Sequence, residues 1–352
     1  MSWYGQCSAR EGGGAGGGAR ARETEARGFR ASRPIGGMLA CRTFLGSNFD
    51  IPRLGTYWLE KHTEAGSRPG CGVKMARLFG IIGNRPDLAA RVLASEVDAL
   101  RARSKGPPLG WGLGFYQGGE VLMRRRPIDE RREIDVAKLA ADVRADLVVG
   151  HVRLATVGAL RTENTHPFRY RQWLFAQAGT VSDFGQVRDR LIASVPDFLR
   201  SGIRGDTDAE VVFHVFLSFL HDAGRLDDGL VEPSLIREAL RSSLAVIDGM
   251  TAEVGGESVK VNLIVSNSDQ IVAVHRSPAA MSVRVLSGKA EAEAVIGDDP
   301  QLRRKIPELA RVHFTLVASD FDDSVPSGRW KAVPDSAIVT MSRDEDPTIE
   351  GL

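Results

Sequence analysis

Cysteine is scarce in this sequence, and it is confined to the N-terminal part. Cys7, Cys41 and Cys71 are the three cysteines among 352 residues, so no thiol follows position 71. Disulfide cross-links, cysteine-ligated metals and thiolate catalysis are therefore excluded from the remainder of the chain.

Long hydrophobic runs and an excess of one charge are also missing. No stretch approaches the roughly 18 to 20 apolar residues that span a bilayer, and Met1 is not followed by a signal-peptide pattern. The formal net charge of +1 gives no large single-sign field for capturing nucleic acid or an anionic membrane. We therefore expect a cytoplasmic protein, with neither nucleic acid nor a membrane as its partner.

The composition of the chain changes near Met75. Residues 1–74 include the stretch EGGGAGGGARARETEARGFRASRP, which cannot bury enough apolar surface to offset the entropy of ordering. We expect this segment to be a disordered, Gly/Arg-rich extension. Its GGGAGGG run lacks the Lys-Ser/Thr ending of a phosphate-binding loop. Residues 75–352 are expected to form one folded domain.

Regular hydrophobic patterns begin at residue 76. Short apolar runs predict strands, and apolar residues three and four positions apart predict helices. The predicted strands cover residues 76–83, 110–116, 120–123, 146–156, 172–181, 260–268, 270–277, 314–320 and 336–343. The predicted helices cover residues 87–103, 184–199, 207–224 and 234–246. This order of strands and helices indicates an α+β protein with antiparallel sheets.

Seven motifs follow one another after residue 74. They are MARLFGIIG, GWGLGFY, GHVRLATVG with TENTHPF, WLFAQAGTVSDF, GDTDAE, NLIVSNSDQIVAVHR and LVASDFDD. With this order and spacing, the sequence resembles the stand-alone class II glutamine amidotransferases over nearly all of residues 75–345. The resemblance implies the four-layered αββα sandwich of the N-terminal nucleophile hydrolases, with two antiparallel sheets. No cofactor is expected.

The resemblance also identifies two departures from the family's chemistry. Its members begin with a cysteine, whose free α-amine activates the thiol for attack on the glutamine side-chain amide. The corresponding residue is Ala76, which has no nucleophile. In FAQAGTV, where the family pattern is close to FAHNGTI, Ala178 replaces the asparagine that forms the oxyanion hole together with the following glycine, here Gly179. Losing one such donor costs about 2.7–4 kcal/mol of transition-state stabilisation. Gln177 replaces the family's histidine.

Two charged residues match the groups with which the family holds its substrate. Arg153, in HVRLAT, corresponds to the arginine that pairs with the glutamine α-carboxylate. Asp208, in GDTDAE, corresponds to the acid that receives the α-amino group. The resemblance therefore implies that the binding groups remain, although the reacting groups are missing.

Both residues also have a purely structural interpretation. Thr207 and Glu210 fit the capping box T-x-x-E, and Asp208 at the first helical position favours the helix dipole without any ligand. Arg153 fits an ordinary strand-end arginine paired with a carboxylate.

The histidines give no metal-binding pattern. His151, His166 and His214 lack a ligand spacing such as H-E-x-x-H, so no metal site is predicted.

Two functions from different classes remain open. The first is a module without glutaminase activity that binds a small amino acid such as glutamine or glutamate, or assembles with a separate synthase or acceptor subunit. The second is an active amidohydrolase or amidotransferase on glutamine or a γ-glutamyl amide, with an unidentified nucleophile. Cys71 is a poor substitute, because PGCGVKM places it on a flexible segment five residues before Ala76.

Overall fold

The structure is a computed structural model that describes residues 76–103, 109–131, 133–154, 158–319 and 329–352. All of these residues belong to one compact unit, Gly70–Leu352. The extension predicted for residues 1–74, including its three cysteines, lies outside the described residues.

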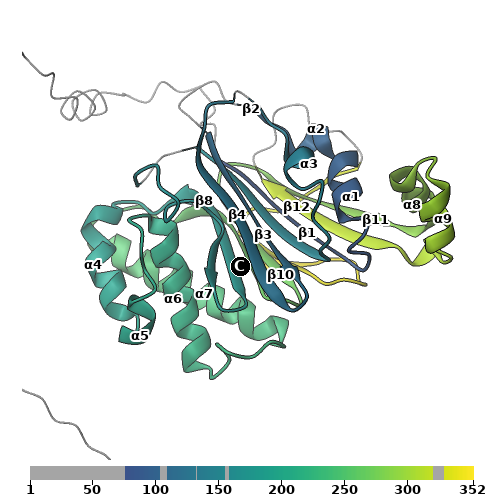
Figure 1. Cartoon of the computed structure of the whole chain (residues 1–352). Coiled ribbons are helices and arrows are strands. Elements are labelled where there is room, and N and C mark those ends of the chain that lie inside the picture. The colour runs from purple at the N-terminus through teal and green to yellow at the C-terminus, as the bar shows by residue number, and fades with distance from the viewer. Residues whose placement is uncertain (1–75, 104–108, 132, 155–157, 320–328) are drawn as a thin grey trace, which may run out of the picture. The chain divides into compact units, whose positions relative to one another are not determined.

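Two antiparallel sheets form the centre of this unit (Figure 1). The larger sheet has seven strands in the spatial order β13 (Lys331–Ala332), β11 (Met281–Ser287), β12 (His313–Ser319), β1 (Arg77–Gly83), β6 (Leu147–Arg153), β3 (Leu109–Gln117) and β4 (Glu120–Asp129). The smaller sheet has six, in the order β15 (Thr348–Gly351), β14 (Ala337–Met341), β10 (Ile271–Arg276), β9 (Lys260–Ser266), β8 (Trp173–Thr180) and β7 (Phe168–Tyr170). A separate short ladder joins β2 (Ala102–Arg103) to β5 (Glu133–Ile134).

Helices cover the outer face of each sheet. The smaller sheet carries α4 (Phe184–Ser194), α5 (Asp197–Arg200), α6 (Asp208–Asp222) and α7 (Pro233–Glu253). The larger sheet carries α1 (Ala89–Ser95), α2 (Val97–Leu100), α3 (Val136–Leu139), α8 (Gly288–Ile296), α9 (Pro300–Lys305) and the 3-10 turn η1 (Leu309–Arg311). One hydrophobic core lies under each helical layer, and a third lies between the two sheets. The predicted αββα sandwich is confirmed.

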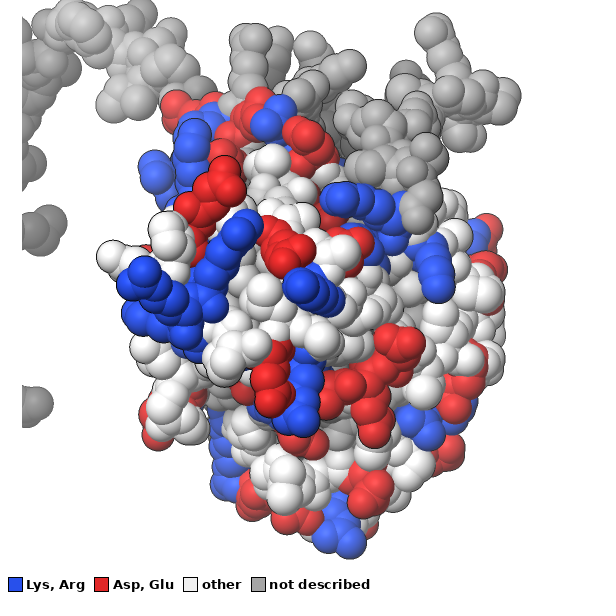
Figure 2. Space-filling view, turned by 90° about the vertical axis from the view of Figure 1, so that its right-hand side faces the viewer, with Lys and Arg blue, Asp and Glu red and all other residues white. Residues whose placement is uncertain are grey.

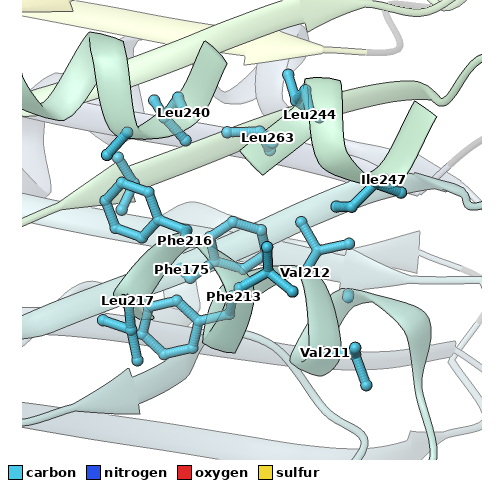
Figure 3. Close-up of a cluster of buried hydrophobic side chains, with 14 of the residues drawn as sticks. Phe175, Val211, Val212, Phe213, Phe216, Leu217, Leu240, Leu244, Ile247 and Leu263 are labelled. Atoms are coloured by element: carbon cyan, nitrogen blue, oxygen red, sulfur yellow. The ribbon is translucent and has the colours of Figure 1, made fainter. Parts of the chain in front are cut away.

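Aromatic packing fixes α6 against the smaller sheet (Figure 3). The Phe175 ring stacks on Phe213 with centroids 5.2 Å apart, and Trp173 meets Phe216 edge-on at 5.7 Å. The helix also contacts α4 and α7, which explains why it is apolar on nearly all sides. Its N-terminus is therefore held firmly beside the end of β8.

The predicted helix over residues 87–103 is wrong as a single element. The chain leaves helical geometry at Glu96 (φ −107°, ψ 20°), so α1 and α2 are separate. This break buries Glu96, whose carboxylate accepts hydrogen bonds from Trp330 Nε1 at 3.0 Å and Arg284 Nε at 3.4 Å. A buried carboxylate needs such partners, and they outweigh the continuous helical period of the sequence.

Two other helix boundaries also differ from the prediction. The segment 184–199 breaks after Ser194, because Pro196 adopts extended geometry as the N-cap residue of α5. By contrast, α7 runs seven residues beyond the predicted end at Val246, to Glu253.

The surface and the helices add two observations. In the view of Figure 2, Lys and Arg side chains are interspersed with Asp and Glu, as the net charge of +1 suggests. Among the described helices, none combines the length and apolar composition that crossing a membrane requires.

Candidate active site

The predicted site residues Ala76 and Arg153 lie at the same end of the larger sheet. Pairing of β1 with β6 places Arg77 opposite Val152, and the same register continued by one residue places Ala76 opposite Arg153. Ala76 is half-buried and packs against the core between the sheets. The predicted nucleophile position is thus next to the predicted carboxylate-binding arginine.

Arg153 is almost completely buried and contacts the loop that follows β6. Its Nη1 donates to the carbonyl oxygen of Ala159 at 3.2 Å, and its Nη2 donates to that of Gly158 at 3.1 Å. Burial lowers the pKa of Arg153, and the nearby Asp206 and Asp208 oppose this shift. The guanidinium therefore stabilises the loop through two hydrogen bonds, and it also interacts electrostatically with the carboxylates of Asp206 and Asp208.

Asn164 connects this loop to the segment before α6. Its Nδ2 donates to the carbonyl oxygen of Ala159 at 2.9 Å and to the Asp206 carboxylate, and its Oδ1 accepts from the backbone N–H of Asp206 at 3.0 Å. The side chain is fully buried, so the loop and the start of α6 form one hydrogen-bonded unit.

The end of β8 supplies the predicted oxyanion positions. Ala178 is buried against the core between the sheets, and its methyl group offers no hydrogen-bond donor. Gly179 has φ +111°, and a Cβ at this residue would lie 2.4 Å from the Lys260 carbonyl oxygen. Glycine is therefore required at position 179 by the backbone, whatever its chemical role.

Asp208 begins α6 and reaches back to the strand that precedes α4. Its Oδ2 accepts a hydrogen bond from the backbone N–H of Val181 at 2.8 Å, two residues after Gly179. Burial raises the pKa of Asp208, whereas hydrogen bonds from the backbone of Val181 and Ala209 and the charge of Arg153 lower it. Asp208 is the first residue of α6, as its structural interpretation required, and its bond to Val181 is a further structural role that the sequence did not predict.

The predicted capping box is correct in one half. Thr207 caps α6, because its Oγ1 accepts from the backbone N–H of Glu210 at 3.3 Å. Glu210 does not complete the box; its carboxylate accepts from the backbone N–H groups of Arg204 at 3.0 Å and Gly205 at 2.6 Å. It therefore closes the turn before the helix.

A buried histidine pair lies beside the site and was not recognised from the sequence. His166 Nδ1 lies 3.3 Å from the ring nitrogens of His151. Burial lowers the pKa of His151 to about 3, and burial also lowers the pKa of His166 well below its usual value. Both rings are therefore neutral at physiological pH. Gln177 is buried too, and neither of its amide atoms has a hydrogen-bond partner in the described chain.

Asn262 is a second residue that sequence reasoning missed. It stands directly opposite Ala178 in the β8–β9 pairing and is fully buried. The available signal was a polar residue inside the otherwise apolar run VNLIV, at a position predicted to be buried. Among the described residues, no group of three or more His, Cys, Asp or Glu side chains is placed to hold a metal ion.

Comparison with known proteins identifies the family. The family model of class II glutamine amidotransferases matches residues 75–334. The chain therefore belongs to the class II glutamine amidotransferases, as the sequence motifs predicted.

Individual relatives are distant. The chain is 26% identical to the probable glutamine amidotransferase DUG3 of Saccharomyces cerevisiae over 59% of this chain and 60% of that protein. It is 24% identical to a glutamine–fructose-6-phosphate aminotransferase of Streptococcus pyogenes over 51% of this chain and 26% of that protein. The chain thus spans less than two thirds of the length of these curated relatives.

A solved structure supports the fold. The glutamine aminotransferase class-II domain protein of Silicibacter pomeroyi superposes with a TM-score of 0.50 at 18% identity, covering 78% of this chain and 98% of the other. At this identity the similarity concerns the fold alone.

Proposed function

We propose that this chain is a class II amidotransferase domain that binds an amino acid but does not hydrolyse glutamine. The observation that carries the proposal is Ala76 at the head of β1, where the family's mechanism requires a nucleophile.

The loss of activity follows from two missing groups. Attack on an amide carbon needs a nucleophile, and the methyl group of Ala76 cannot provide one. The tetrahedral intermediate needs donors for its oxygen, and the Ala178 side chain removes one of them. Restoring a single group would leave the other defect in place.

The binding groups support retention of a ligand. Arg153 carries a planar cation suited to an α-carboxylate, and Asp208 carries an anion suited to an α-ammonium group. Each charged hydrogen bond contributes roughly 1.5–3 kcal/mol. Two such contacts, less the cost of ordering the ligand, correspond to a dissociation constant near millimolar, or about 4 kcal/mol. Glutamine and glutamate are the proposed ligands.

A separate acceptor protein is the proposed partner. The match to the Streptococcus pyogenes aminotransferase covers 26% of that protein, so most of that protein has no counterpart in the match. We infer that a subunit or assembly role for this chain would bring it together with an acceptor domain.

Ammonia release from glutamine tests the proposed loss of activity. The full chain and a variant with Cys7→Ser, Cys41→Ser and Cys71→Ser should both remain at background. Turnover that disappears in the thiol-free variant would identify an N-terminal cysteine as the nucleophile. Turnover that persists in it would establish an active amidohydrolase with a different nucleophile. Either result would contradict the proposal.

Calorimetry at millimolar ligand tests the proposed pocket. Arg153→Ala should abolish binding of glutamine and glutamate. Arg125→Ala is the matched control, because Arg125 Nη1 also holds this region, through the Thr165 carbonyl oxygen at 3.1 Å. If both variants lose binding equally, the effect of Arg153 is loop support and not ligand contact.

A further inference from the structure

Asn262 has one amide atom anchored and the other unsatisfied. Its Nδ2 donates to the carbonyl oxygen of Ala279 at 2.7 Å, and its Oδ1 has no hydrogen-bond partner within the part of the chain that the structure describes. The residue is fully buried. A buried carbonyl oxygen without a hydrogen-bond donor destabilises the folded state, which suggests that this oxygen has another role.

The orientation of this amide follows from its partner. A backbone carbonyl can only accept a hydrogen bond, so the atom facing Ala279 must be the NH₂ group of Asn262. The atom that remains is therefore an oxygen, which accepts hydrogen bonds and repels anionic oxygens.

Strand geometry places the side chain in the layer between the sheets. Its neighbours Val261 and Leu263 pack in the core under α6 and α7, whereas Ile264 packs in the core between the sheets. Side chains alternate along a strand, so Asn262 points to the same side as Ile264. Ala178, directly opposite on β8, also packs in the core between the sheets. Asn262 thus lies on the same face as Ala178 and beside it.

We infer that Asn262 is a specificity-determining residue, whose Oδ1 accepts a hydrogen bond from the side-chain carboxamide NH₂ of a bound glutamine. This inference rests on the proposed function, in which Arg153 and Asp208 hold the α-carboxylate and the α-ammonium group. The predicted reacting positions of that proposal are Ala76 and Ala178, and Asn262 stands directly opposite Ala178 on the neighbouring strand. A carboxamide supplies a donor there, and a carboxylate does not.

The chemistry makes the site select glutamine over glutamate. Glutamate would bring a charged oxygen toward an oxygen acceptor that cannot rotate, because Ala279 holds the other end of the amide. Sites that hydrogen-bond a particular ligand group discriminate strongly against analogues that lack it. We expect glutamine to bind about tenfold more tightly than glutamate at neutral pH.

Calorimetric titration of the full-length protein with L-glutamine and L-glutamate tests this inference. Asn262→Ala should weaken glutamine binding about tenfold and change glutamate binding less than about threefold, so the preference disappears. If Asn262→Ala does not fold, Asn262→Val is compatible with a strand and carries the same test.

Asn267 provides a matched control. It is also a fully buried asparagine with one unsatisfied amide atom, Nδ2, and it follows the other end of β9. Its Oδ1 accepts from the backbone N–H groups of Asp269 and Gln270, each at 3.0 Å, so Asn267→Ala disturbs a turn. The preference for glutamine should survive in Asn267→Ala.

The outcomes separate this inference from the proposed function. Equal binding of both ligands to the parent protein, or a preference that survives Asn262→Ala, would overturn the role of Asn262 and leave the amino-acid pocket intact. Absence of any binding to the parent protein would overturn the pocket, and the inference with it.

Discussion

The Asp208 carboxylate accepts the backbone N–H of Val181 at 2.8 Å, and this bond links the first residue of α6 to the end of β8. The carboxylate is buried, and the aromatic packing of α6 on the smaller sheet keeps the two elements in place. Asp208 therefore stabilises the fold through one carboxylate oxygen, and its charge also interacts with that of Arg153. Substitutions can separate these two contributions.

Asp208→Asn should preserve stability and weaken ligand binding. The amide oxygen can still accept the Val181 N–H, so the free energy of unfolding should change by less than about 1 kcal/mol. Asp208→Ala leaves that buried N–H without an acceptor and should cost about 1–3 kcal/mol. Urea denaturation measures the difference. Equal stabilities of the two variants would mean that the bond to Val181 contributes little.

Acid should destabilise the protein through its buried histidines. The pKa of His151 is lowered from about 6.5 to about 3 by burial, so the folded ring stays neutral while the unfolded ring takes up a proton. Its contribution to stability is therefore complete above pH 6.5 and is lost as the pH falls from 6.5 toward 3. His166 has a lowered pKa and acts in the same direction. Each histidine contributes a slope of about 1.4 kcal/mol per pH unit within its window.

A variant isolates this effect from the acidic groups. Burial raises the pKa of Asp208 and of Glu210, which gives stability that is present at low pH and lost as the pH rises. His151→Gln leaves both acids in place. Between pH 6.5 and 4, the parent should therefore take up about one more proton on unfolding than the variant does. Its free energy of unfolding should fall more steeply with decreasing pH, by about 1.4 kcal/mol per pH unit. Chemical denaturation across this range checks the prediction, and parallel curves would contradict it.

Local patterns in the sequence predict many elements of this fold, but they do not reveal contacts between residues that are far apart in the chain. Strand β1 and helix α6 follow from apolar periodicity, and the Thr207 cap follows from residues three positions apart. The break at Glu96 depends on Trp330, which is 234 positions away, and no local pattern can reveal it.

The same limit applies to the candidate site. Motifs predicted four of the candidate site residues, namely Arg153, Asp208, Ala76 and Ala178. Each motif is a short continuous stretch, so it can be read from the sequence alone. The place of Asn262 beside Ala178 depends on the register of β8 and β9, whose strands are separated by four helices and 79 residues of chain between Thr180 and Lys260. The prediction that Glu210 completes the capping box was wrong for a related reason. The Glu210 carboxylate accepts a hydrogen bond from the backbone N–H of Gly205, in the turn before the helix.

Gln177→Met should stabilise the protein. Gln177 is buried with two amide atoms that lack hydrogen-bond partners in the described residues, and methionine has a similar length without polar atoms. We expect a gain of about 1–2 kcal/mol in the free energy of unfolding. Urea denaturation again provides the measurement, with Gln177→Glu as the opposite case, because it buries a charge. A loss of stability in Gln177→Met would indicate that the amide has a bound partner in solution.

Glutaminase activity should return only when both missing groups are restored. In a chain that begins at Met75, removal of this methionine would give Ala76→Cys the free α-amine that the family's mechanism uses. This variant alone should show little ammonia release, because Ala178 leaves the oxyanion short of a side-chain donor. Adding Ala178→Asn should raise kcat by about 10²- to 10³-fold, the usual effect of one oxyanion-hole donor. Ala178→Asp in the same background is the matched control, since an ionised carboxylate has nearly the same shape but cannot donate. Equal activity of the single variant and the variant with Ala178→Asn would show that position 178 does not face the developing charge.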